Sequence, residues 1–159
     1  MIIVRRFETT DAQAVSALIA KTLRITNSKD YSSEELERLI GHLTPEKLIE
    51  RAGWTHFYVL CDGEKIVGCG AIGPYWGSAT ESCLFNIFVH PTCQGKGIGR
   101  KIIETLEADE FALRASRIEI PASITGCQFY RKLGYDYKNG IKALDAEQHY
   151  PLEKFTDPE

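Results

Sequence analysis

No stretch of the 159-residue sequence approaches the roughly 18 consecutive apolar residues that a membrane-spanning helix requires. The pattern of a secretory signal peptide is also missing. The sequence starts with four apolar residues followed by two arginines, whereas a signal peptide places its charge first and a longer apolar stretch after it. We therefore expect a cytoplasmic protein with no membrane partner.

An excess of positive charge is lacking as well. Lys and Arg together number 19, Asp and Glu number 22, and the formal net charge is −3. No basic run stands out against this balance, so the sequence lacks the electrostatic pattern of a protein that binds DNA or RNA. Nucleic acid is not an expected partner.

Paired cysteines are a further absence. The five cysteines are odd in number and well separated, with no Cys-x-x-Cys pair and no histidine at zinc-finger spacing. Neither a disulfide framework nor a metal site is predicted. Linkers, internal repeats and low-complexity segments are lacking too, while 43% of the residues are hydrophobic. We expect one domain over residues 1–159, large enough to bury its own core.

The first third of the chain predicts one strand and three helices. A β-branched run over residues 2–7 favours a strand, and the segment Thr10–Gln13 has the spacing of a capping box at a helix start. The segment Ser32–Glu35 repeats that spacing before a second apolar stripe. A third, short helix is predicted over the segment 44–53, which has proline at its first helical position and ends in glycine.

Strands dominate the middle of the chain. Apolar runs over residues 56–61 and 66–72 flank Asp62-Gly63, a typical hairpin turn. A third run over residues 82–89 ends at His90-Pro91. These three segments predict an antiparallel meander.

The last third is expected as helix, strand, helix, strand and strand, over residues 97–113, 117–120, 124–133, 135–138 and 148–155. Ser123, just before the second of these helices, carries a hydroxyl that is suited to cap it. Pro151 cannot donate a ladder hydrogen bond, so we interpret the final run as an edge strand or a bulged one. The whole order predicts an α/β fold with a central, mostly antiparallel mixed sheet flanked by helices.

One local segment concentrates the functional signal. Residues Gln94–Arg100 lie between a strand and a long helix and contain three glycines within five residues. Bare backbone amides at the start of a helix converge on a point suited to a phosphate or pyrophosphate, and Lys96 adds positive charge there. The alternative is a strand-to-helix turn that uses glycine only for its conformational freedom.

The known phosphate loops narrow the choice. The P-loop pattern G-x-x-x-x-G-K-[ST] does not occur in the sequence. The dinucleotide pattern G-x-G-x-x-G fails at its third glycine, because Gly97-Ile98-Gly99 is followed by Arg100, Lys101 and Ile102. That pattern also opens on the first strand of a parallel sheet, not after an antiparallel meander. We therefore set the dinucleotide-binding reading aside.

The segment Gln94–Gly99 does match the acetyl-CoA motif Arg/Gln-x-x-Gly-x-Gly/Ala. It follows Val89-His90-Pro91, and the segment Phe129–Tyr135 stands about thirty residues further on. Together these motifs resemble the GNAT (GCN5-related N-acetyltransferase) superfamily, and the predicted order of elements is similar to that family from end to end. The resemblance implies the GNAT acyl-CoA N-acyltransferase fold.

The resemblance also implies which residues bind the cosubstrate acetyl-CoA. The glycine loop would wrap the pyrophosphate, the end of the preceding strand would carry a bulge that pairs with pantetheine, and the Val89 amide would polarise the thioester carbonyl. Ser123 stands where the family often has an asparagine that contacts CoA. The expected contacts are Ile87, Phe88, Val89, Gln94, Gly95, Lys96, Gly97, Ile98, Gly99, Arg100 and Ser123.

Catalytic roles follow from the same resemblance. Tyr130 falls on a tyrosine that protonates the departing thiolate, which is reasonable because a phenol has a pKa of about 10 and a thiol one of about 8.5. The alternative is that Tyr130 only packs its helix. The base is not given by the resemblance: an amine is mostly protonated at neutral pH, so a group must accept its proton, and Glu81 is the first candidate and Glu119 the second, although each could be an ordinary strand-end charge. Cys83 occupies the position where the family's glutamate usually falls, and we interpret it as a core thiol.

The expected function is therefore N-acetylation of a primary amine, on a small molecule, with acetyl-CoA as cosubstrate and no metal. A protein or peptide N-acetyltransferase is one alternative, and a non-catalytic acyl-CoA-binding module is another. Four aromatic residues are candidates for the acceptor pocket, and they could equally belong to the core or to the contacts of a homodimer. They are Tyr31, Trp54, Tyr75 and Trp76.

Overall fold

The computed structural model describes residues 1–157, which form two compact units. The first comprises Met1–Ala71 and Asn86–Leu106, and the second comprises Ile72–Phe85 and the residues from Glu107 onward. Seven strands join in the order β1-β2-β3-β4-β5-β7-β6. The predicted class, α/β with a mixed sheet, is confirmed. The extent of the domain, 1–159, stays a prediction, and its last two residues lie outside the described ones.

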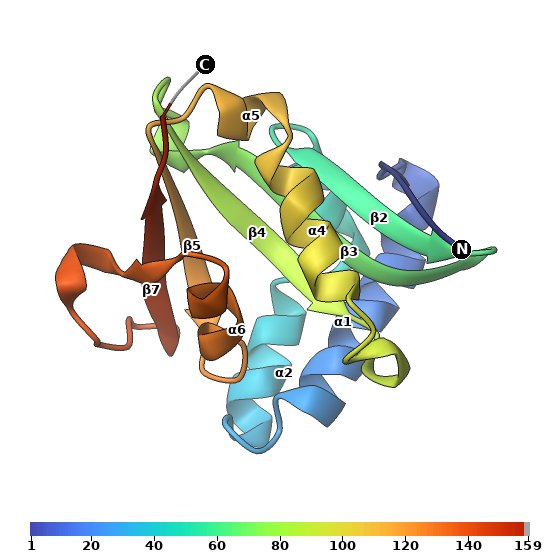
Figure 1. Ribbon diagram of the computed structural model, residues 1–159. Helices are drawn as coiled ribbons and strands as arrows, with labels where there is room; N and C mark the ends of the chain where they lie inside the picture. The colour runs from blue at the N-terminus through green and yellow to red at the C-terminus, as the bar shows by residue number, and fades with distance from the viewer. Residues whose placement is uncertain (158–159) are drawn as a thin grey trace. The chain divides into compact units, whose positions relative to one another are not determined.

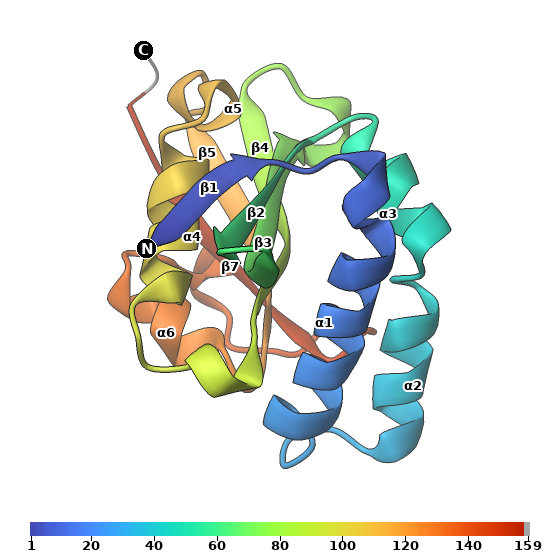
Figure 2. The same cartoon turned by 90° about the vertical axis from the view of Figure 1, so that its right-hand side faces the viewer.

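The first unit holds the N-terminal helices and the strands of the meander. Its elements are β1 (Ile2–Arg6), α1 (Ala12–Thr26), α2 (Ser33–Gly41), α3 (Pro45–Ala52), β2 (His56–Asp62), most of β3 (Lys65–Pro74), the end of β4 (Glu81–Val89) and α4 (Ile98–Glu107). Strand β1 pairs antiparallel with β2. Helix α1 packs against both α2 and α3, and Figure 2 shows α1 and α2 side by side.

Helix starts were predicted well at two of three places. Ser32 and Glu35 form the expected capping box, and the Thr44 hydroxyl caps α3, which begins at Pro45. The capping box predicted at Thr10–Gln13 is wrong. The observed box joins Glu8 and Asp11 around a 3-10 turn at Thr9–Asp11, and α1 follows from Ala12. The two acidic side chains of this box accept each other's backbone amides, so the box stands two residues before the expected one.

Asp11 also anchors β1. Its carboxylate accepts two hydrogen bonds from the Arg5 guanidinium, at 2.8 and 2.9 Å, and one from the Glu8 amide at 2.8 Å. The hydrogen bonds from Arg5 hold the pKa of Asp11 below its usual range, although partial burial opposes them. A carboxyl group with a lowered folded-state pKa stabilises the fold above its unfolded pKa and loses that contribution as the pH falls through its folded pKa.

We expect Asp11→Asn to lower the free energy of unfolding by about 1 to 2 kcal/mol at neutral pH. The value lies toward the low end for charged hydrogen bonds, because the Arg5 side chain is 41% exposed and water screens it. The difference from the wild type should shrink as the pH falls below about 4, where Asp11 of the unfolded chain becomes protonated, and should disappear below the lowered folded-state pKa of Asp11. Urea unfolding at several pH values measures both effects, and a gap that does not vary with pH would contradict them.

Two glycines in β3 let helix α4 lie close to the sheet. A Cβ atom at Gly70 would stand 2.7 Å from Cγ2 of Ile102, and one at Gly68 would stand 3.1 Å from Cγ2 of Ile98. Real Cβ atoms essentially never show a contact under 3.0 Å, so a larger residue at Gly70 would require Ile102 to shift. The buried apolar stripe of α4, which includes Ile102 and Leu106, packs on this surface.

The second unit carries the C-terminal strands. Its elements are the start of β4, a 3-10 turn at Tyr75–Gly77, α5 (Glu110–Leu113), β5 (Arg117–Ser123), α6 (Cys127–Lys132), β6 (Asp136–Tyr137) and β7 (His149–Phe155). Strand β4 pairs with β5 over residues 81–83, and this pairing is the parallel one among the described pairs. Strand β5 pairs antiparallel with β7 along its whole length. Figure 1 shows β5 and β7 side by side.

Two predicted helices have different bounds in the structure. The helix expected over 97–113 is two helices, because the Asp109 carboxylate accepts the Phe111 amide at 2.8 Å and starts α5 as a separate turn. The helix expected from residue 124 begins at Cys127. Ser123 does not cap it at its first residue, since its hydroxyl accepts the amide of Gly126, one residue before the helix, at 2.9 Å.

The interpretation of the last strand as an edge strand is wrong. Strand β7 lies between β5 and β6, and Pro151 stands opposite Pro121. Neither proline has an N–H group, so the pair occupies a position where the two strands exchange no hydrogen bond. The described pairing of β7 with β6 is limited to Leu152 and Glu153, and therefore no ladder bond is lost on that side of Pro151.

Candidate active site

The glycine loop lies entirely in the first unit, between the end of β4 and helix α4. After the 3-10 turn at Pro91–Cys93, Gly95 and Gly97 adopt φ values of +76° and +80°. A Cβ atom at either glycine would meet nothing within 4 Å, so the backbone direction, and not crowding, requires glycine here. The Gln94 side chain folds back and donates to the Val89 carbonyl at 2.9 Å, which ties the loop to the strand.

Free amides face outward where α4 begins. The first amide to donate within the helix is that of Lys101, to the carbonyl of Gly97 at 3.1 Å. The N–H groups of Ile98, Gly99 and Arg100 therefore have no acceptor within the helix, and the positive end of the helix dipole lies at the same place. The Ile98 side chain is buried, while Lys96 and Arg100 are exposed. This arrangement suits a phosphate or pyrophosphate.

The end of β4 departs from regular strand geometry one residue before the predicted bulge. Asn86 has a φ of +54°, in the left-handed region, and Ile87, Phe88 and Val89 follow it. The Val89 carbonyl accepts from the Thr22 hydroxyl at 3.3 Å as well as from Gln94. The sequence analysis did not single out Asn86. The available signal was its residue type, since Asn is among the few non-glycine residues that tolerate this conformation.

Tyr130, Glu81 and Ser123 belong to the second unit. Tyr130 lies on α6 and is only 8% exposed, with its ring edge-on to Phe129 at a centroid distance of 5.3 Å. A Cβ atom at Gly126 would stand 3.2 Å from Cε2 of Tyr130, so glycine at that position leaves room for the ring. The packing fixes the orientation of the phenol, and its role as an acid stays a prediction.

Both candidate bases contact the same buried cation. The guanidinium of Arg117, a residue 7% exposed, pairs with Glu81 at 3.3 Å, with Glu153 at 2.7 Å and with Glu119. Lys138 adds a second positive charge, 3.0 Å from Glu119. We call this group of five side chains the Arg117 cluster. The sequence analysis found two of its carboxylates and missed the cation that joins them.

The cluster keeps the buried carboxylate of Glu153 charged. Burial would raise the pKa of Glu153, but hydrogen bonds from Arg117 and from the Asn139 amide hold it below its usual range. The pKa of Lys138 is raised by its hydrogen bonds to Tyr75 and to Glu119. Glu81 is the most exposed of the three carboxylates, with 35% of its side chain accessible. Its role as a base stays a prediction.

The four aromatic candidates have different surroundings. In the first unit, Tyr31 is buried in the core, while Trp54 is 47% exposed beneath the Arg51 guanidinium. In the second unit, the Tyr75 ring lies under both Arg117 and Lys138, and Trp76 is 91% exposed. Cys83 is buried, as expected of a core thiol.

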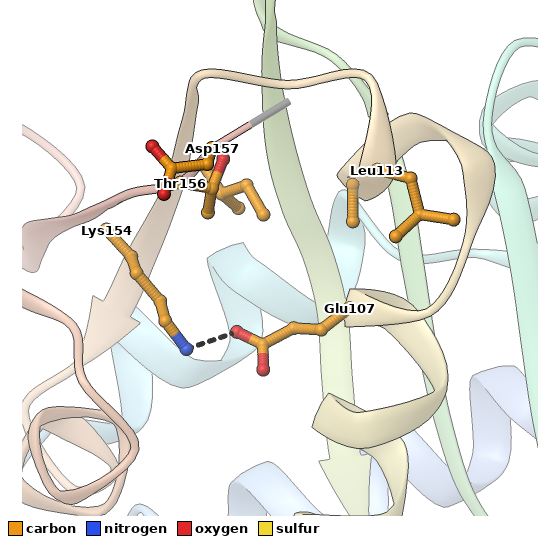
Figure 3. Close-up of a pocket in the computed structure, with 7 residues that line it drawn as sticks. Glu107, Leu113, Lys154, Thr156 and Asp157 are labelled. Atoms are coloured by element: carbon orange, nitrogen blue, oxygen red, sulfur yellow. Dashed lines mark hydrogen bonds and ion pairs between the residues drawn. The ribbon is translucent and has the colours of Figure 1, made fainter. Parts of the chain in front are cut away.

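A shallow pocket of about 190 Å³ in the second unit contains none of the predicted site residues. Figure 3 shows Lys154 and Glu107 meeting across it in an ion pair of 2.9 Å. Glu107 also accepts a hydrogen bond from the buried Tyr135 hydroxyl at 2.9 Å. The two oppositely charged side chains of this pocket therefore neutralise each other, which is typical of a structural contact.

A mixed sheet with this strand order, in which a strand leads through a glycine loop into a helix with free amides, defines an acyl-CoA transferase fold. The sequence profile of the acetyltransferase (GNAT) domain matches residues 53–137, more than half of the chain, and the chain therefore belongs to the GNAT acetyltransferase family. The family that the motifs resemble is thus confirmed, and with it the fold. No curated protein sequence matches the chain.

Solved structures share this fold at low sequence identity. The PaiA N-acetyltransferase of Thermoplasma acidophilum, in complex with coenzyme A, is 18% identical with a TM-score of 0.81, covering 98% of this chain and 99% of that one. A GCN5-related N-acetyltransferase of Rhodopseudomonas palustris is 20% identical, with a TM-score of 0.79 and coverages of 97% and 95%. A GNAT family acetyltransferase of Brucella melitensis, in complex with acetyl-CoA, is 18% identical, with a TM-score of 0.68 and coverages of 100% and 90%.

No helix within residues 1–157 is both long and apolar enough to cross a membrane. In the same part of the chain, His, Cys, Asp and Glu side chains form no group of three that could hold a metal ion.

Proposed function

We propose that this acetyltransferase transfers the acetyl group of acetyl-CoA to the primary amine of a small molecule. The observation that carries the proposal is the Gln94–Arg100 loop, with two left-handed glycines and three free helix amides beside exposed Lys96 and Arg100. Similar chains bind coenzyme A or acetyl-CoA, which supports the choice of cosubstrate. A cytoplasmic location and a homodimer stay predictions.

The proposed binding roles follow the loop. Its amides hold the pyrophosphate, and the two cations neutralise its charge. The Val89 N–H group donates to the thioester carbonyl as negative charge develops there. Ser123 is proposed as a further contact with CoA, although its hydroxyl already accepts the Gly126 amide.

The reaction is a direct attack. The neutral amine nitrogen bonds to the carbonyl carbon, the carbon–sulfur bond breaks, and the thiolate of CoA leaves with the electron pair. Glu81 takes the proton lost by the amine, through water, and Tyr130 supplies a proton to the thiolate. The amide and free CoA are the products, and the proton count is balanced once Glu81 and Tyr130 exchange protons with solvent.

We expect Tyr130→Phe to lower kcat about tenfold and to change the KM for acetyl-CoA less than threefold. The effect is smaller than that of most general acids, because a thiolate with a pKa near 8.5 leaves well without full protonation. Phenylalanine keeps the ring packing with Phe129 and Gly126. Steady-state kinetics with an amine acceptor measures the change, and Phe129→Leu is the control for altered packing of α6. Wild-type kcat in Tyr130→Phe would assign Tyr130 to packing alone.

The function is tested by calorimetric titration of acetyl-CoA into the protein, followed by a screen of small amines and of peptides for release of free CoA. Micromolar binding and turnover with a small amine would support the proposal. Turnover with peptides alone would favour the protein N-acetyltransferase. Binding without turnover on any amine would favour a non-catalytic acyl-CoA-binding module, and no binding by the folded protein would contradict the cosubstrate.

A further inference from the structure

The left-handed backbone at Asn86 is unusual inside a strand. Residues other than glycine adopt this backbone conformation at an energetic cost, and the hydrogen bonds of a regular strand do not offset that cost. Two neighbouring elements of the first unit contact Asn86. The Arg51 guanidinium of α3 donates to its side-chain oxygen at 3.2 Å, and the Cys69 thiol of β3 donates to its main-chain carbonyl at 3.2 Å.

Cys69 also serves the next part of the strand. Its sulfur receives a backbone hydrogen bond from Phe88, two residues beyond Asn86. One thiol therefore bonds on both sides of Ile87, to the carbonyl of Asn86 and to the amide of Phe88. A sulfur atom makes both bonds because a thiol donates weakly and accepts weakly.

The thiol is held in its protonated form. Cys69 is fully buried, and burial raises its pKa to about 12. A proton is therefore present to donate to Asn86 at neutral pH, and the group is neither a nucleophile nor readily oxidised. Its neighbours Gly68 and Gly70 point to the opposite face of β3, where α4 packs.

We propose that Cys69 is a positioning residue, which together with Arg51 holds the bulge at Asn86 and so orients the Val89 amide toward the thioester. This inference rests on the proposed function. According to this proposal, the buried Cys69 affects the rate of acetyl transfer through the position of the bulge.

The competing explanation is that Cys69 only fills space, and substitutions at a second buried cysteine separate the two. Cys69→Ala removes both hydrogen bonds together with the volume of the sulfur. Cys69→Ser keeps a donor and an acceptor. Cys61→Ala, in β2 of the same unit, removes a buried thiol that has no contact with the bulge in the described hydrogen bonds.

We expect Cys69→Ala to lower kcat about tenfold with the KM for acetyl-CoA changed less than threefold, which corresponds to the loss of about one good hydrogen bond. Cys69→Ser should stay within threefold of the wild type, and Cys61→Ala should match it. Wild-type kcat in Cys69→Ala, or an equal loss in Cys69→Ser and Cys69→Ala, would overturn the proposal.

Amide NMR spectra of the same variants provide a second measurement that does not depend on activity. Resonances of residues 86–89 should shift in Cys69→Ala, return toward wild type in Cys69→Ser and stay in place in Cys61→Ala. Arg51→Met, which acts from α3, should shift Asn86 and keeps the inference testable if Cys69→Ala does not fold. Unmoved resonances would overturn the proposed role of Cys69, whereas shifted resonances in a protein that binds no acetyl-CoA would contradict the proposed function alone.

Discussion

Gly97→Glu should weaken acetyl-CoA binding about 100-fold, or about 2.8 kcal/mol at 1.4 kcal/mol per factor of ten. Gly97 has a φ of +80°, where a residue with a Cβ atom is strained by roughly 1–2 kcal/mol. The glutamate also places a negative charge beside amides that are proposed to hold a pyrophosphate, and like charges repel there. Calorimetric titration measures the loss.

Gly63→Glu is the matched control. Gly63 adopts a φ of +63°, nothing lies within 4 Å of the position of its Cβ, and it stands in the hairpin turn between β2 and β3 of the same unit. The two variants therefore carry the same substitution and a similar backbone strain, and only one alters the glycine loop. Equal affinities in Gly97→Glu and the wild type, with both folded by circular dichroism, would remove the loop from the cosubstrate site.

Arg117→Met should destabilise the protein by about 3 kcal/mol. The methionine fills much of the space of the Arg117 side chain, so little of the loss comes from packing. Most of it arises because Glu119 and Glu153, whose side chains are 12% and 11% exposed, lose the positive charge that neutralises them. An uncompensated buried charge costs more than the ion pair itself contributes. Urea unfolding followed by far-UV circular dichroism measures the change.

The destabilisation by Arg117→Met should depend on pH and on the carboxylate of Glu153, one of the ion-pair partners of Arg117. In the wild type, Arg117 helps to hold the pKa of Glu153 below its usual range, so in the variant Glu153 is protonated at a higher pH, and its protonation removes the unpaired charge and narrows the gap to wild type as the pH falls. Combining Arg117→Met with Glu153→Gln should recover part of the loss. Arg24→Met, which breaks an exposed ion pair with Glu37, serves as control and should leave stability unchanged within error. A cost for Arg117→Met as small as that of Arg24→Met would mean that the cluster is not a stabilising element.

Local signals explain what the sequence could predict. The caps at Ser32 and Thr44 and the hairpin turn at Asp62-Gly63 depend on residues within a few positions of one another, so short patterns suffice to find them. The glycine loop is equally local, and for that reason its motif, with the two motifs that flank it, is enough to indicate the family.

Features set by distant residues escaped prediction. Pro151 reads as an edge residue until Pro121, thirty positions earlier, is known to stand opposite it. The 97–113 pattern keeps its helical period across Asp109, although that side chain starts a new helix. The Arg117 cluster joins residues from β4, β5, β7 and the 3-10 turn at Lys138–Gly140, and no spacing in the sequence predicts such a group.

The close approach of α4 to β3 also links residues that never meet a ligand. A Cβ atom at Gly70 would lie 2.7 Å from Ile102 and 3.2 Å from Leu106. The size of side chain that position 70 tolerates therefore depends on the side chains at positions 102 and 106. Among descendants of a common ancestor, we expect these positions to change together or not at all, with a larger residue in the strand accompanied by a smaller one on the helix. Such paired changes would preserve the distance between α4 and the sheet, and with it the direction in which the first amides of α4 point.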